Sequence, residues 1–285
     1  MVRRHMQEPT GEFNPRVGII TPTTGNQDFA DCLKSIAAQD YPNLQHYVVV
    51  DGPMYEAKVR ALLGEEIRPN VTLIVLPENT GRAGYYGYRI YGSIPLQINT
   101  DFVCFLDEDN WLNPNHVSSL VRLAGKLDLD WAYSLRNITS PDGEILFEDN
   151  CDSLGFWGTW LSQQHHIDIS CYLLKRELAA SLAWIFNRKG YSTDNIDSDR
   201  GMCRWLLYHN PKGFTTGEYT VNYRLSRPAR KDPLGRPPNA DLHFYQDGNE
   251  HMHALYKYFP WRKPTRYKFN PKTDYRQIVP DPPAR

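Results

Sequence analysis

Phe102-Val103-Cys104-Phe105-Leu106-Asp107-Glu108-Asp109 is a stretch of five apolar residues followed directly by three carboxylates. An apolar run without polar alternation is typical of a strand that is buried on both faces of a parallel sheet. Hard divalent cations prefer oxygen ligands, which they share between protein carboxylates and substrate phosphates. We therefore expect Asp107 and Asp109 to hold Mn²⁺ or Mg²⁺, and a solvated acidic turn is the alternative interpretation.

Three more apolar runs precede this stretch, and each also ends in polar residues. They are Val17–Ile20 before Thr21-Pro22-Thr23-Thr24, Tyr47–Val50 before Asp51-Gly52, and Val71–Leu76 before Pro77-Glu78-Asn79. Segments with helical spacing of apolar residues lie between the runs. This alternation predicts an α/β fold with a mostly parallel sheet flanked by helices. Ligands of such sheets bind beyond the carboxyl ends of the strands, where these polar residues stand.

The ends of the second and third runs carry groups that suit a nucleotide. Asp51 can accept a hydrogen bond from a nucleobase N–H, although Asp-Gly is also an ordinary turn. After Asn79, the small residue Gly81 lets a ligand approach the backbone, and Arg82 can meet a phosphate. A plain helix start is the alternative interpretation of this segment.

The alternation of apolar runs and helical segments is less regular after residue 130. Apolar segments on both sides of Pro141-Asp142-Gly143 predict a hairpin, and Ile169–Leu174 predicts a strand followed by a helix to about Phe186. A further helix is expected over Ser198–Tyr208. Residues 226–285 are rich in Pro, Arg, Lys and Tyr with little periodicity, which predicts an extended C-terminal tail.

Composition limits the functions that the chain can have. It has 41% hydrophobic and 23% charged residues, which is typical of a globular protein with a sizeable core. The net charge of −1 gives no general attraction to nucleic acid or anionic membranes, so no nucleic-acid partner is expected. Five scattered cysteines favour buried thiols in a reducing compartment. With no apolar signal region at the start and no transmembrane segment, we expect a cytoplasmic protein.

The four motifs together resemble the GT-A glycosyltransferases of the family 2 type over roughly residues 16–115. Those proteins begin with an apolar strand that closes on a Pro-Thr turn, and then carry an Asp, an Asn-x-Gly segment and an Asp-x-Asp signature. The resemblance implies a Rossmann-like GT-A fold and a nucleotide-sugar donor, often a UDP-sugar. It implies metal binding by Asp109 and Asp107, with Mn²⁺ or Mg²⁺ as the cofactor. The donor-binding residues that it implies are Thr21, Pro22, Thr23, Asp51, Asn79, Gly81, Arg82, Asp107 and Glu108.

The same resemblance implies a catalytic base at the start of a later helix. Asp199 stands at the position of the second acid of the family's acidic pair, with Ser198 where the family commonly has Glu. Asp197 is the alternative, and helix capping is the structural explanation for both. The base takes the proton from the acceptor hydroxyl during an inverting displacement.

The segment before that helix is expected to face a glycan or other hydroxyl acceptor. Trp157 and Trp160 are the acceptor-binding candidates, because aromatic rings can stack on sugars. His165 and His166 are adjacent, so a joint metal site there is not expected. Tyr223-Arg224 and the basic residues of the tail either close over the diphosphate or remain solvated; these basic residues are Arg227, Arg230 and Lys231.

We therefore expect a glycosyltransferase domain over residues 16–225, with a nucleotide-sugar-binding half (16–115), an acceptor-binding half (116–225) and a C-terminal extension (226–285). One rival is a sugar-phosphate nucleotidyltransferase, which carries a Gly-rich, basic loop after its first strand. Residues 21–26 contain one Gly and no Lys or Arg, which argues against it. The other rival is a non-catalytic nucleotide-sugar or glycan-binding protein on the same scaffold. The sequence does not determine the oligomeric state.

Overall fold

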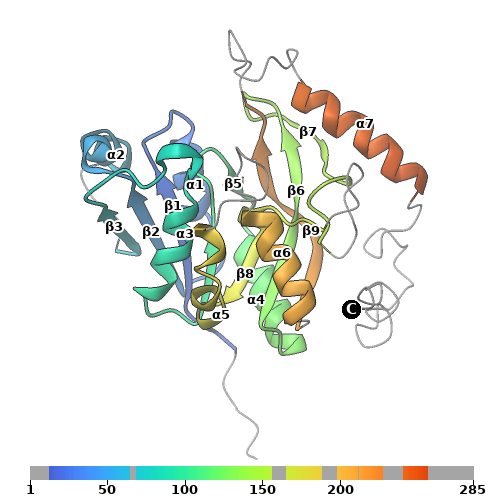
Figure 1. The fold of residues 1–285 in the computed structure, drawn as a ribbon, viewed down its shortest axis with the longest axis horizontal. Coiled ribbons are helices and arrows are strands. Elements are labelled where there is room, and N and C mark those ends of the chain that lie inside the picture. The colour runs from blue at the N-terminus through green and yellow to red at the C-terminus, as the bar shows by residue number, and fades with distance from the viewer. Residues whose placement is uncertain are drawn as a thin grey trace, which may run out of the picture.

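The computed structural model describes residues 13–64, 69–155, 165–187, 198–210, 212–226 and 240–255. Within these ranges, one curled nine-stranded sheet runs through the molecule, with helices against both of its faces (Figure 1). The main path of the sheet has the order β3-β2-β1-β4-β8-β6-β9-β5, and β7 pairs with β6.

The first half of the sheet is parallel, as the unbroken apolar runs predict. Its strands are β1 (Val17–Thr23), β2 (Leu44–Val50), β3 (Val71–Val75) and β4 (Phe102–Phe105). β1 lies between β2 and β4, with Thr23 beside Val50 and Ile20 beside Phe105. All four strands therefore end at the same edge of the sheet.

The second half is mixed. β8 (Tyr172–Lys175) is antiparallel to both β4 and β6 (Trp131–Thr139), while β9 (Gly213–Arg224) runs parallel to β6. β6 and β7 (Ile145–Glu148) form the expected hairpin, and the short β5 (Trp111–Leu112) pairs with β9.

The helices cover the apolar strands. Figure 1 shows α3, α5 and α6 on the near face of the sheet and α4 on the far face. The α-helices are α1 (Phe29–Ala37), α2 (Glu56–Leu63), α3 (Tyr88–Ser93), α4 (His116–Leu127), α5 (Arg176–Ser181), α6 (Ser198–His209) and α7 (Ala240–Leu255). Single 3₁₀ turns are η1 (Pro53–Tyr55), η2 (Arg82–Gly84), η3 (Ile94–Leu96), η4 (Ile169–Cys171) and η5 (Ile185–Asn187).

The sequence did not predict α3, β5 and β9, and three further expectations differ from the structure. The strand expected at residue 169 begins with the 3₁₀ turn η4, because the Asp168 side chain accepts the Ser170 N–H and caps it. The helix expected to reach residue 186 ends at Ser181 and is followed by η5. Residues 226–285 contain the helix α7, which the weak periodicity of that segment did not predict.

The core is continuous across both halves. Apolar side chains of β1, β2, β4, β6 and β8 form one buried cluster with those of α1, α3, α4 and α6. All five cysteines are buried free thiols, as their odd number and scattered spacing predict. In the ranges that the structure describes, every helix is too short or too polar to cross a membrane.

Candidate active site

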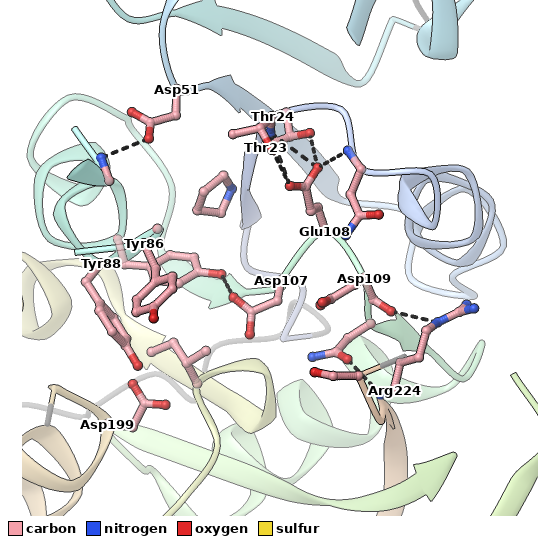
Figure 2. A pocket seen from close by; sticks show the side chains of 18 of the residues that line it. Thr23, Thr24, Asp51, Tyr86, Tyr88, Asp107, Glu108, Asp109, Asp199 and Arg224 are labelled. Atoms are coloured by element: carbon pink, nitrogen blue, oxygen red, sulfur yellow. Dashed lines mark hydrogen bonds between the residues drawn. The ribbon is translucent and has the colours of Figure 1, made fainter. Parts of the chain in front are cut away.

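A cavity of about 630 Å³ lies at the carboxyl ends of the four parallel strands. Pro22 comes from the end of β1, Asp51 from the end of β2, Asn79 from the loop after β3, and Asp107 from the turn after β4. Figure 2 shows Asp51, Asp107, Asp109 and Asp199 around this cavity. The prediction that residues following buried strands meet in one cleft is therefore confirmed.

Ten of the site residues expected from the sequence line the cavity. They are Pro22, Thr23, Asp51, Asn79, Gly81, Arg82, Asp107, Glu108, Asp109 and Asp199. The expectation for Thr21 is corrected: its side chain is fully buried, and its Oγ1 lies 3.0 Å from His46 Nε2. Thr21 lies within β1, further from the carboxyl end of the strand than Pro22 and Thr23, and its side chain stays in the core. Trp157, Trp160 and Asp197 lie outside the described residues.

Asp51 fastens the loop that follows β3. One carboxylate oxygen accepts hydrogen bonds from the Thr80 N–H (2.6 Å) and hydroxyl (2.8 Å), and the other accepts the Gly81 N–H (2.9 Å). A Cβ at Gly81 would lie 2.7 Å from the Tyr86 carbonyl oxygen, so this position requires glycine. Asp51 thus shapes this wall of the cavity, and at most part of its acceptor capacity is left for a ligand.

Glu108 fastens the loop that follows β1. Its carboxylate accepts hydrogen bonds from the Thr23 hydroxyl (2.6 Å), the Thr24 hydroxyl (3.0 Å) and the Asn26 N–H (2.8 Å). The Thr24 N–H also points at it, 3.2 Å from Oε1. The middle acid of the Asp-Glu-Asp run therefore serves the protein's own backbone.

The surroundings of Asp107 and Asp109 disfavour the ionised form of both carboxyl groups. The Tyr91 hydroxyl donates a 2.6 Å hydrogen bond to Asp107 Oδ1 and fixes that carboxylate. Burial, with the charges of Asp109 and Asp168, raises the pKa of Asp107 well above its usual value. Burial, with the charges of Glu108 and Asp168, also raises the pKa of Asp109. A bound cation would relieve this repulsion.

The donor set fits a cation that a substrate helps to bind. No group of three or more His, Cys, Asp or Glu side chains within the described ranges is arranged to hold a metal ion alone. Mg²⁺ is commonly bound by one or two carboxylates together with substrate phosphates and water. Asp107 and Asp109 supply that number of ligands.

Asp199 lies in the first turn of α6 and closes the far side of the cavity. The Tyr88 side chain is directed at it from α3 (Figure 2). The charge of Asp199, followed by burial, raises the pKa of Tyr88, so this phenol stays protonated beside the carboxylate. Both Tyr88 and Tyr91 line the site and were missed by the sequence analysis, because aromatic residues in a helix usually pack in the core.

Arg224 lines the cavity and is not the solvated residue of the alternative expectation. It is 8% exposed and donates to Asp28 (3.1 Å) and Asp31 (2.7 Å). Its Nε also donates to the Asp109 carbonyl oxygen at 3.1 Å. Arg224 thus ties α1 to the acidic turn. The tail residues Arg227, Arg230 and Lys231 lie outside the described residues.

A buried ionic network, also missed by the sequence analysis, lies in the second half of the sheet. The Arg136 guanidinium is 2% exposed and donates to Asp149, Asp152 and Asp168. It also lies 4.4 Å from the ring centroid of Tyr223, which lines the cavity. His166 Nδ1 lies 3.1 Å from Asp152, so that histidine belongs to this network.

Comparison with known proteins agrees with this geometry. Residues 19–144 match the family model described as Glycosyl transferase family 2. They form a family 2-like domain of the GT-A fold. An N-acetylglucosaminyltransferase of Mesorhizobium japonicum is 36% identical over 119 residues, which cover 39% of this chain and 26% of that protein.

Solved structures resemble the family 2-like domain and the elements that follow it. The crystal structure of residues 1–349 of S. aureus TarS has a TM-score of 0.54 at 13% identity, covering 73% of this chain and 60% of that one. The same fragment in complex with UDP-GlcNAc has a TM-score of 0.51 at 14% identity, covering 74% of this chain and 59% of that one. At such low identity these structures show the fold alone. The chain spans about a quarter of the bacterial relative and about 60% of the TarS fragment.

Proposed function

We propose that this chain transfers a sugar from a nucleotide-diphosphate sugar to the hydroxyl group of a glycan or another acceptor. The observation that carries the proposal is the cavity itself, which gathers Asp51, Gly81, Asp107, Asp109 and Asp199 at the carboxyl edge of the sheet. The M. japonicum N-acetylglucosaminyltransferase and the TarS complex with UDP-GlcNAc support a UDP-sugar donor, with UDP-GlcNAc as the first candidate.

The donor half of the site is residues 16–115. The nucleoside lies between Pro22 and the loop after β3, where the exposed ring of Tyr86 can stack on a flat base. The diphosphate lies toward Asp107 and Asp109, and Arg82 from the cavity rim adds a positive charge. Asp107 and Asp109 would hold Mn²⁺ or Mg²⁺, and the cation would supply positive charge against the charge that develops on the leaving diphosphate.

The acceptor half is residues 116–225, and Asp199 is its base. As the acceptor oxygen forms a bond to the anomeric carbon, Asp199 takes the hydroxyl proton. The bond from that carbon to the diphosphate oxygen breaks, and its electron pair leaves with the nucleoside diphosphate. This single displacement inverts the anomeric configuration. Tyr88 stays protonated beside Asp199 and orients its carboxylate.

The β1 loop argues against the rival nucleotidyltransferase function. Backbone N–H groups of a loop after the first strand can cradle phosphate only when they are free. Here the N–H groups of Thr24 and Asn26 point at the Glu108 carboxylate, which would itself repel a phosphate. The phosphates therefore belong on the acidic turn with a cation.

A thermal-shift screen of nucleoside diphosphates and nucleotide sugars, with and without Mn²⁺, tests the proposal. Ligands that bind the native state raise the unfolding temperature, so UDP and UDP-GlcNAc with Mn²⁺ should give the largest shifts. Slow Mn²⁺-dependent hydrolysis of the best donor would then separate an enzyme from a non-catalytic binding protein. Absence of any shift with every nucleotide tested would contradict the proposal.

A further inference from the structure

Glu108 is the one member of the acidic run whose side chain faces the β1 loop. Figure 2 shows it directed at Thr23 and Thr24, whereas Asp107 and Asp109 lie on the other side of the turn. Both of its carboxylate oxygens accept hydrogen bonds from the loop. A carboxylate engaged in this way has little acceptor capacity left for a cation.

The loop that it holds has a tight and specific shape. Thr23 Oγ1 donates to Glu108 and accepts a 2.9 Å hydrogen bond from the Gly25 N–H. Gly25 has a φ of 75°, in the left-handed region that favours glycine. The carboxylate, the threonine hydroxyl and the glycine turn therefore form one connected hydrogen-bond chain along this wall of the cavity.

Glu108 links two parts of the cavity because of its position in the chain. Its neighbours on both sides, Asp107 and Asp109, form the acidic turn, and Pro22 precedes the threonine that it binds. Release of Glu108 would remove one of the links between the nucleoside wall and the acidic turn, beside the link that Arg224 makes between α1 and Asp109. A donor must touch both at once, because its base and its diphosphate are parts of one molecule.

We propose that Glu108 is a positioning residue that couples the nucleoside wall of the cavity to the acidic turn, without contacting donor or cation itself. The proposal rests on the proposed function for its ligand. It assigns the three acids of the run two different tasks: the outer pair serves the cation and diphosphate, and the middle one serves the geometry of the donor pocket.

Glu108→Gln tests the coupling, because glutamine keeps the size of the side chain but loses the charge and one acceptor. With saturating Mn²⁺, we expect about tenfold weaker UDP binding by calorimetry, a similar rise in the KM for the donor, and a kcat within a few-fold of wild type. Glu177→Gln, at an 88% exposed side chain on α5, is the matched control and should bind UDP normally. Unfolding temperatures of both variants report any general loss of fold.

A double-mutant cycle with Thr23→Val separates positioning from a merely additive loss of stability. Since the Thr23 hydroxyl acts through its contact with Glu108, the double variant should bind UDP about as weakly as Glu108→Gln alone. Fully additive losses, or unchanged UDP affinity in Glu108→Gln, would overturn the proposal. Loss of Mn²⁺ dependence in Glu108→Gln would also overturn it, because Glu108 would then be a metal ligand.

Hydrogen exchange without ligand makes this test independent of the proposed function. The amides of Thr24 and Asn26 should exchange faster in Glu108→Gln than in the wild type and in Glu177→Gln. If the wild type bound no nucleotide, the proposed function would fail and with it the coupling to a donor. Unchanged exchange in Glu108→Gln, with normal nucleotide binding in the wild type, would overturn the positioning role alone.

Discussion

The two halves of the sheet bury different kinds of side chain. In the parallel half, β2 buries a continuous run, Tyr47–Val50, in which every side chain is apolar. In the second half, β6 is buried along its whole length and includes Ser134, Arg136, Asn137 and Thr139. The polar side chains buried in the parallel strands are uncharged, among them Thr21 and His46, whereas the second half buries the charged Arg136 among aspartates.

This difference follows from what each half is proposed to do. The parallel half places its charged groups in loops beyond the strands, where Asp51 and Glu108 hold the walls of the donor pocket. The second half carries charge within the core, because Arg136 binds three aspartates and contacts Tyr223 beneath the cavity. Tyr245 of α7 completes this network through a 2.9 Å hydrogen bond from Arg136.

The largest expected effect is a loss of turnover without a loss of donor binding. Asp199→Asn keeps the shape of the side chain and its place in the first turn of α6, but it cannot take a proton near neutral pH. Turnover should fall about 10²–10⁴-fold, while UDP affinity barely changes. Turnover and UDP binding should be measured side by side on Asp199→Asn and Asp197→Asn. Normal turnover in Asp199→Asn with a dead Asp197→Asn would move the base to Asp197, and normal turnover in both would refute the mechanism.

The second prediction concerns the core of each half. Arg136→Met removes the cation that three buried aspartates share, so it should lower the free energy of unfolding by about 3–5 kcal/mol. Ile20→Val, at a fully buried position of β1, should lower it by only about 0.5–1.5 kcal/mol. Urea unfolding of the two variants measures the contrast. Equal losses would show that the ionic core is no more sensitive than the apolar one.

The contrast also explains what the sequence could predict. Unbroken apolar runs determined the four parallel strands, and the position after each run located Asp51, Asn79 and Asp107 in one cavity. The partners of Asp51 and Glu108 were not predictable, because Thr80 and Thr23 are distant in sequence from the carboxylates that they bind. Thr21 shows the limit of motif reasoning, since its side chain is buried beside His46 and does not line the cavity.

In the second half, the sequence pattern carried less information. Arg136 lies within β6, and an arginine in a strand indicates a solvated face when its partners are not known. Its burial is tolerable because three aspartates surround its guanidinium. These partners lie 13 to 32 positions away along the chain. The helix α7 was missed for a similar reason, since Tyr245 and Asn249 fasten it to residues of the β6–β7 region. Tertiary contacts, which local patterns do not encode, determine these elements.

A smaller effect should appear in the pH dependence of stability. His46 of β2 and His116 of α4 are fully buried, and burial lowers the pKa of each to about 3. The unfolded chain takes up their protons near pH 6.5, whereas the folded chain does not. Stability is therefore lost as the pH falls below about 6.5, by about 1 kcal/mol for each histidine between pH 7.5 and 5.5. Urea unfolding of His46→Gln and His116→Gln at both pH values measures each share, and a variant that retains the full wild-type slope would contradict the assignment of that histidine.

The most direct test of the account is calorimetry of UDP binding with and without Mn²⁺, on the wild type and on Asp109→Ala. Without a cation, the carboxylates of Asp107 and Asp109 repel the diphosphate. Burial, and then neighbouring negative charge, raises the pKa of each. We predict that Mn²⁺ strengthens UDP binding to the wild type by about tenfold or more, roughly 1.4 kcal/mol, and that Asp109→Ala loses this dependence on Mn²⁺. Unchanged Mn²⁺-dependent affinity in Asp109→Ala would contradict the assignment of the acidic turn as the cation and diphosphate site.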